Sequence, residues 1–219
     1  MTGPDLQSGH RARRNGGGMG LSGPVGFDLD MTLIDSRPAI MASFAELARE
    51  TATAIDLAAV DSRLGIKLED EVVFWFPAEQ QAAAVACYRR HYVRLAPRLT
   101  TILPGAREAV EAVRAAGERV VIITAKHPVS VEPSLRAVGL AADELFTHVH
   151  GPEKAAVLRN LDAAAYVGDS PPDMAAAAQA GTRAVGVTTG SFSRHELTGA
   201  GADVVLDSLA EFPAWYQDA

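Results

Sequence analysis

Val25-Gly26-Phe27-Asp28-Leu29-Asp30-Met31-Thr32-Leu33 joins a short apolar run to two closely spaced acidic residues. The run Val25-Gly26-Phe27 predicts a buried strand that ends where the acids begin. Because successive strand residues point to opposite sides, Asp28 and Asp30 share one side of the chain as the strand ends. A buried strand followed directly by paired acids is typical of the carboxyl edge of a parallel sheet, where ligands of open α/β proteins bind.

Five further apolar runs predict strands, at residues 119–123, 147–149, 165–167, 184–187 and 203–206. Helical patterns lie between them and end at glycines: residues 106–116 precede Gly117, and residues 174–180 precede Gly181. This alternation predicts an α/β fold, a doubly wound, mostly parallel, Rossmann-like sheet with helices on both faces.

The segment between the first two strands is far longer than a crossover needs and contains no convincing strand. Apolar residues at helical spacing predict helices over residues 38–51 and 78–95. We therefore expect an α/β core formed by residues 25–36 and 104–219, with residues 37–103 as an inserted small α-helical cap. Residues 1–24 are Gly-rich and lack apolar periodicity, so we expect a disordered tail, in which Met19 is an alternative start.

Composition excludes several classes of function. The chain has 219 residues, of which 48% are hydrophobic, and its formal charge is −7, from 20 Lys and Arg against 27 Asp and Glu. This acidic balance argues against nucleic acid as a partner, and no apolar run is long enough for a membrane helix. The single cysteine, Cys87, provides neither a disulfide nor the ligand set of a structural zinc site. We expect a cytoplasmic protein, either a monomer or a homodimer, with a role for Cys87 in packing.

Polar residues also follow the other predicted strands. Thr124 follows the second strand, Lys154 opens the helix after the third, and Asp169 and Asp173 follow the fourth. Carboxylates gathered at one sheet edge repel one another unless a cation lies among them, and Mg²⁺ prefers such oxygen ligands. A lysine and a hydroxyl beside this metal would suit the oxygens of a phosphoryl group.

Four segments, in order, resemble the motifs of the haloacid dehalogenase superfamily, in its phosphatase branch with a helical cap. They are Asp28-Leu29-Asp30-Met31-Thr32, Val121-Ile122-Ile123-Thr124, Lys154, and Gly168-Asp169-Ser170-Pro171-Pro172-Asp173. The trailing Ile34-Asp35-Ser36 is similar to the phosphoglycolate phosphatase subgroup. Two departures stand out: Met31 replaces the usual glycine, and Gly151-Pro152-Glu153-Lys154 replaces the subgroup's Lys-Pro-x-Pro.

The resemblance implies a role for each matching residue. Asp28 would be the nucleophile that forms an aspartyl-phosphate and a metal ligand, while Asp30 would act as general acid and base and bind the metal through its backbone carbonyl. The other implied residues are Thr124, Ala125 and Lys154 on the substrate phosphate, Lys67 of the cap on the substrate, Asp169 as a direct Mg²⁺ ligand, and Asp173 as a further or outer ligand. Asp173 would alternatively cap the helix that begins near it.

We therefore expect a Mg²⁺-dependent phosphatase acting on a small phosphorylated metabolite, which could be a phosphoglycolate-like compound, a sugar phosphate or a nucleotide monophosphate. Asp30 argues against a dehalogenase or a phosphonatase, which lack that second acid. A phosphomutase of the same family and a non-catalytic phospho-ligand-binding relative remain alternatives. For residues outside the motifs we expect structural roles: Lys126 at the site rim or in solvent, His148 and His150 along a strand, and Arg89, Arg90 and Arg94 on a solvated helix face.

Overall fold

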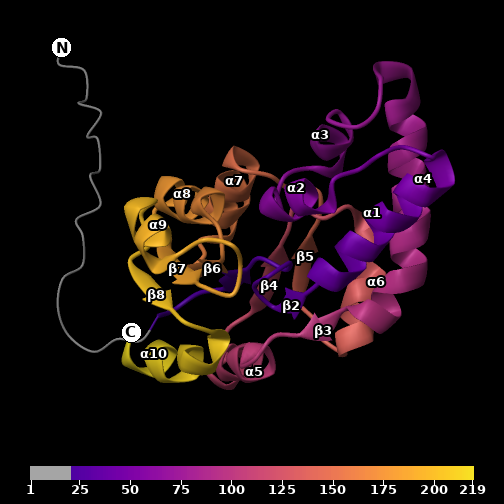
Figure 1. Cartoon of the computed structure of the whole chain (residues 1–219). Coiled ribbons are helices and arrows are strands. Elements are labelled where there is room, and N and C mark those ends of the chain that lie inside the picture. The colour runs from indigo at the N-terminus through magenta and orange to yellow at the C-terminus, as the bar shows by residue number, and fades with distance from the viewer. Residues whose placement is uncertain (1–20) are drawn as a thin grey trace, which may run out of the picture.

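The computed structural model describes residues 21–219 and contains a six-stranded parallel sheet (Figure 1). Its strands lie in the order β5-β4-β1-β6-β7-β8. Their bounds are β1 Val25–Phe27, β4 Val120–Ile123, β5 Glu144–Phe146, β6 Ala165–Gly168, β7 Arg183–Val187 and β8 Val204–Leu206. The chain therefore runs from β1 to one edge and returns to the other side of β1, which makes β1 the point where strand order reverses.

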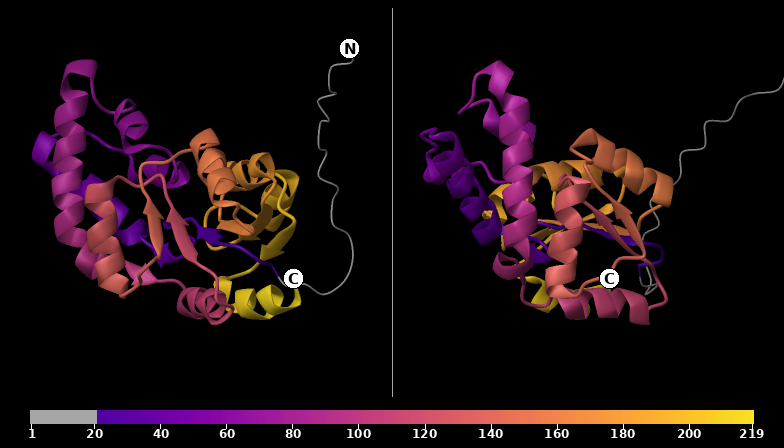
Figure 2. Two further views of the ribbon diagram at one scale, coloured as in Figure 1. Left: turned by 180° about the vertical axis from the view of Figure 1, so that it is seen from behind. Right: turned by 90° about the vertical axis from the view of Figure 1, so that its right-hand side faces the viewer.

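Helices cover both faces of this sheet (Figures 1 and 2). On one face lie α5 (Ala106–Ala115), α6 (Pro128–Val138) and α10 (Phe212–Asp218), which follows the short 3₁₀ turn η1 (Leu209–Glu211). On the other lie α7 (Pro152–Leu161), α8 (Pro171–Ala180) and α9 (Arg194–Gly199). The predicted doubly wound α/β architecture is confirmed.

Strand β4 shows how the sequence produces two cores. Val120 and Ile122 are buried in the cluster that contains α5 and α10, whereas Val121 and Ile123 are buried in the cluster that contains α7 and α8. Alternate strand residues point to opposite faces, so a strand covered on both faces reads as a continuous apolar run.

A helical insertion, residues 37–99, separates β1 from β4. It contains α1 (Arg37–Thr51), α2 (Leu57–Ser62), α3 (Leu68–Val72) and α4 (Ala78–Leu99). These helices have their own apolar core, in which the rings of Phe44 and Tyr88 lie 4.6 Å apart. The insertion is joined to the sheet by a small antiparallel pair, β2 (Ile34–Asp35) and β3 (Thr101–Ile102), in a segment where the sequence predicts no strand.

The strand predicted at residues 147–149 was misplaced, because the structure has β5 at Glu144–Phe146. This edge strand reads Glu144-Leu145-Phe146, so a charged residue shortens the apolar run that marks the interior strands. At residues 147–149 the chain turns instead. His148 has φ of +59°, and the Val149 N–H donates to the backbone carbonyl of Thr124 at 3.0 Å. His148 and His150 therefore do not alternate along a strand.

The predicted tail lies mostly outside the described residues, which begin at Leu21. Leu21 packs against the core, and the carbonyl of Pro24 accepts a hydrogen bond from Ala164 N at 2.9 Å. Within residues 21–219, none of the helices has the length and apolar character that crossing a membrane requires.

Candidate active site

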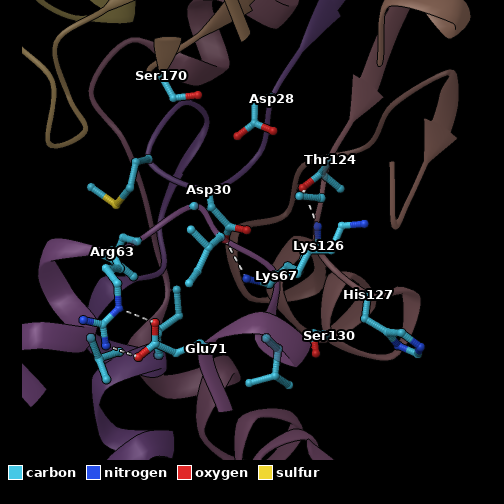
Figure 3. A pocket seen from close by; sticks show the side chains of 18 of the residues that line it. Asp28, Asp30, Arg63, Lys67, Glu71, Thr124, Lys126, His127, Ser130 and Ser170 are labelled. Atoms are coloured by element: carbon cyan, nitrogen blue, oxygen red, sulfur yellow. Dashed lines mark hydrogen bonds and ion pairs between the residues drawn. The ribbon is translucent and has the colours of Figure 1, made fainter. Parts of the chain in front are cut away.

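Three neighbouring strands bring the predicted site residues to one edge of the sheet. Asp28 follows β1, Thr124 follows β4 and Asp169 follows β6, and β1 pairs with both of the other strands. All three residues are buried and line one pocket, in which Figure 3 shows Asp28 and Thr124. The pairing in register explains why residues far apart in sequence meet here.

Three carboxylates form the centre of the pocket. Carboxylate oxygens of Asp28, Asp169 and Asp173 all lie within 4.8 Å of one another. Lys154 lies between two of them, donating from Nζ to Asp28 Oδ1 at 2.7 Å and to Asp173 Oδ1 at 2.7 Å. One lysine therefore faces three acids, so the cluster keeps an excess of negative charge that a divalent cation would balance.

Burial and mutual repulsion shift the titration of these groups. Burial, opposed by the charge of Lys154 and reinforced by Asp173, raises the pKa of Asp28 to about 7. Burial, followed by the charges of Asp173 and Asp28, raises the pKa of Asp169 well above its ordinary value. Burial alone would lower the pKa of Lys154, but Asp173 and Asp28 hold it well above the usual range. Lys154 therefore stays charged.

Tyr166 is a site residue that sequence reasoning missed. Its hydroxyl lies 2.9 Å from Lys154 Nζ, donates to the Ile123 carbonyl at 3.0 Å and lies 3.1 Å from Asp173 Oδ1. In the sequence it looked like one more apolar residue of a buried strand. Ser170 was also missed, and its hydroxyl donates to Asp173 Oδ2 at 2.5 Å. Both Asp173 oxygens are thus engaged by side chains, which favours a role in positioning Lys154.

Asp30 lies beside the carboxylate cluster rather than in it. Its Oδ1 accepts hydrogen bonds from Lys126 Nζ at 2.6 Å and from the Ser36 hydroxyl at 2.5 Å. The prediction that Lys126 lies at the rim or in solvent is wrong: its side chain is 8% exposed, and its Nζ lies 4.5 Å from the centre of the Tyr92 ring. Lys126 thus connects the core to helix α4 at the site itself.

The loop after Asp28 accommodates the unusual Met31. Met31 has φ of +61°, a left-handed conformation in which glycine is normally favoured. Its N–H donates to the Ile34 carbonyl at 2.8 Å, and its own carbonyl accepts from the Thr189 hydroxyl at 2.5 Å. These contacts explain how a residue with a side chain can hold this turn.

The helical insertion forms the other wall of the pocket (Figure 3). Lys67 and Arg63 line it, and Arg63 is held by Glu71 through two hydrogen bonds of 2.9 and 2.6 Å. Arg89 also lines it and pairs with Glu69, so the prediction that this arginine belongs to a solvated face is wrong. Its neighbour Arg90 is exposed, as expected.

The remaining predicted residues lie where the sequence places them. Thr124 is buried, and its Oγ1 accepts from Lys126 N at 3.1 Å. Ala125 lines the pocket, and Lys154 lies in the first turn of α7. One pocket therefore brings together every predicted site residue: Asp28, Asp30, Lys67, Thr124, Ala125, Lys154, Asp169 and Asp173.

A parallel sheet with buried acids at its carboxyl edge defines the chain as an α/β protein with an enzyme-like acidic site. Residues 25–187 match the family model described as haloacid dehalogenase-like hydrolase. The chain belongs to this family of hydrolases.

Known relatives cover nearly the whole chain. A Cupriavidus necator protein named "Phosphoglycolate phosphatase, plasmid" is 31% identical over 207 residues, covering 85% of this chain and 90% of that protein. A Dickeya dadantii protein named "Probable phosphatase IndB" is 30% identical over 207 residues, covering 84% and 89%. In fold, the chain is similar to a crystal structure described as a predicted phosphoglycolate phosphatase from Haemophilus somnus, with a TM-score of 0.78 and 21% identity over 90% of this chain and 99% of that one.

Proposed function

We propose that this chain is a Mg²⁺-dependent phosphatase that hydrolyses a small phosphorylated metabolite through an aspartyl-phosphate on Asp28. The observation that carries the proposal is the buried cluster of Asp28, Asp169 and Asp173, with Lys154 bonded to two of its carboxylates. An oxygen nucleophile, a fixed cation and an excess of acidic oxygens suit the transfer of an anionic phosphoryl group.

The donor set fits magnesium. All the donors are oxygens, and Mg²⁺ is a hard cation that binds one or two carboxylates together with substrate phosphate. Asp28 and Asp169 would be direct ligands, and the Asp30 backbone carbonyl would be a third. Asp173 would be an outer residue that positions Lys154. When bound, Mg²⁺ would neutralise charge on the phosphoryl oxygens and hold the nucleophile in its ionised form.

Asp28 and Asp30 would divide the chemistry between them. In the first step an Asp28 carboxylate oxygen attacks phosphorus, the bond to the substrate's alcohol oxygen breaks, and Asp30 gives that oxygen a proton. In the second step Asp30 takes a proton from a water molecule that attacks the phosphorus, which releases phosphate and restores Asp28. Thr124 and Lys154 would hold the phosphoryl oxygens throughout, with Ala125 beside them.

The helical insertion, residues 37–99, would act as a cap that selects the substrate. Its contribution to the pocket includes Lys67, Arg63 and Arg89, three cationic side chains opposite the acidic cluster. Because Arg63 and Arg89 are paired with Glu71 and Glu69, it is chiefly Lys67 that favours a substrate with an anionic group beyond the phosphate, such as the carboxylate of phosphoglycolate, over a neutral sugar phosphate. The segments at Ser36–Pro38 and Leu103–Gly105 would act as hinges that close the cap and exclude water.

Hydrolysis of an aryl phosphate and of phosphoglycolate by the purified chain tests this function, with Mg²⁺ and with a chelator. We expect phosphate release only with Mg²⁺, and mass spectrometry of the quenched reaction should find one phosphoryl group on the peptide that contains Asp28. Release of phosphate in the presence of the chelator, or without a phosphoryl group on the Asp28 peptide, would contradict the proposed mechanism.

Other outcomes distinguish the alternatives. A phosphomutase would form the same phosphorylated peptide but pass the phosphoryl group to a second sugar phosphate faster than to water. A binding protein would bind phosphoglycolate with Mg²⁺ and form no phosphorylated peptide. A cytoplasmic location and a monomeric or homodimeric state remain part of the proposal.

A further inference from the structure

A second cluster of metal-ligating side chains lies in the helical insertion, and none of its members lines the active-site pocket. Glu50 comes from α1, and Cys87 and His91 come from α4. One ligand atom from each, a carboxylate oxygen, Sγ and a ring nitrogen, all lie within 4.8 Å of one another. Thiolate, imidazole and carboxylate are the three ligand types that bind Zn²⁺ in proteins.

The spacing of these residues explains why their side chains converge. Cys87 and His91 are four positions apart on one helix and therefore lie on the same face, one turn apart. Helices α1 and α4 pack side by side (Figure 2), which brings Glu50 to that face. His91 Nε2 already lies 2.8 Å from Glu50 Oε2. Cys87 and His91 are buried, whereas Glu50 is exposed and provides the route to solvent.

A cation already lies at this position. One nitrogen of the Arg90 guanidinium lies 2.5 Å from Glu50 Oε1 and 3.4 Å from Cys87 Sγ. The side chain of Arg90 is 59% exposed, so most of it already lies in solvent. Arg94 donates to His91 Nδ1 at 3.3 Å and also lies 3.9 Å from Glu46. The two arginines therefore compete with a metal ion for these ligands from the solvent side of the site.

We propose that Glu50, Cys87 and His91 bind a divalent transition-metal ion of the zinc type, which links α1 to α4 within the helical insertion. The site is separate from the acidic Mg²⁺ centre. Its ligands differ in kind, because sulfur and imidazole select Zn²⁺ or Co²⁺ over Mg²⁺.

Binding of the metal ion releases one proton. The Cys87 thiol loses its proton to solvent, and the sulfur lone pair forms a bond to the ion. The proton on His91 Nε2 moves to Nδ1, which displaces the Arg94 contact and frees Nε2 to coordinate. Glu50 exchanges Arg90 for the metal, and water completes the coordination. No electron is transferred.

The single cysteine allows a direct spectroscopic test. Co²⁺ is added to the untagged full-length chain in excess Mg²⁺, and thiolate-to-cobalt charge-transfer absorption is recorded. Because Cys87 is the only cysteine, this band reports on this site alone. We expect the band to saturate at one Co²⁺ per chain and to disappear when one equivalent of Zn²⁺ is added. Absence of the band would overturn the proposal.

Variants separate this site from other metal sites on the chain. Glu50→Gln leaves the buried residues intact, and we expect it to weaken Co²⁺ binding by at least about tenfold. Arg90→Gln removes the competing cation and should tighten binding several-fold. Asp169→Asn, in the acidic cluster, should leave the charge-transfer band unchanged. Equal affinity in Glu50→Gln would show that Glu50 is not a ligand, and loss of the band in Asp169→Asn would show that the site is not separate from the acidic centre, so either result would overturn the proposal.

Discussion

The α/β core and the helical insertion handle charge in opposite ways around one pocket. In the core, Lys154 and Asp173 are almost fully buried and bonded to each other, from the first turns of α7 and α8. In the insertion, Arg89 and Arg63 are partly exposed and are paired with acids of the short helix α3. The core therefore fixes the reacting groups, whereas the insertion presents groups that can readjust to a ligand.

This difference explains how catalysis and selectivity can be separated. Buried charges that depend on one another tolerate few changes, since loss of one partner leaves another uncompensated. In the insertion, the partly exposed Arg89–Glu69 pair contributes little to stability, whereas loss of Arg63 would leave the buried carboxylate of Glu71 unpaired. Substitutions in the two regions should thus have different effects on turnover, stability and substrate affinity.

The largest effect is expected at Asp28. Asp28→Asn removes the proposed nucleophile but keeps the shape of the side chain, so kcat for phosphate release should fall by at least about 10³-fold. The fold should persist, because the amide replaces one of three buried carboxylates and Asp173 still pairs with Lys154. Steady-state kinetics with Mg²⁺ and circular dichroism measure the two effects. Activity within tenfold of the unmodified chain would remove Asp28 from the mechanism.

Asp30 should have the next largest effect. Asp30→Asn removes the proposed proton donor, and general acids contribute roughly 10²-fold to 10⁴-fold. The loss should be larger for phosphoglycolate than for an aryl phosphate, because an aryloxide leaves without needing a proton. Comparison of kcat for the two substrates checks this. Equal losses would contradict a role for Asp30 in protonating the leaving group during the rate-limiting step.

The core site was predictable because its chemistry is tied to periodic structure. Buried strands are apparent from their apolar residues, and Asp28, Thr124 and Asp169 directly follow three of them, so parallel pairing alone brings them together. Edge strand β5 was misplaced because it begins with the charged Glu144, which shortens that apolar signal.

The partners of these residues could not be predicted in the same way. Tyr166 reads as an apolar residue until the structure shows its hydroxyl between Lys154 and Asp173. Lys126 reads as a surface residue because its contacts with Asp30 and Tyr92 come from distant segments. Such contacts depend on how the insertion packs on the core, and no local pattern encodes that packing.

Stability should depend on pH in opposite ways in the two regions. Folding raises the pKa of Asp28 from 3.8 to about 7, so the folded core binds more protons than the unfolded chain between these values. The free energy of unfolding should therefore fall as pH rises through this range. In the insertion, Arg90 and His91 lower the pKa of Glu50 to about 2, so its contribution is lost only as pH falls below the ordinary value of 4.5.

Thermal unfolding in chelator measures this pH dependence. The melting temperature should decrease from about pH 5 to pH 8 in the unmodified chain and decrease less in Asp28→Asn. Mg²⁺ should also reduce the decrease, because it binds the ionised carboxylates of the folded state only. A melting temperature that rises over this range in chelator would show that the core carboxylates are ionised without cost.

The smallest effect is expected at Lys67, in the insertion. If its ammonium group binds the substrate carboxylate, Lys67→Ala should raise KM for phosphoglycolate about tenfold, since a hydrogen bond to a charged group contributes about 1.5 kcal/mol. Its kcat should stay unchanged, because Lys67 lies on the opposite wall from the reacting groups. An aryl phosphate has no carboxylate, so its KM should not change. Lys67→Arg should restore part of the affinity, and Arg98→Ala, which removes an exposed cation of α4 outside the pocket, is the matched control. A drop in kcat in Lys67→Ala would place this lysine with the core machinery and contradict the division between the two regions.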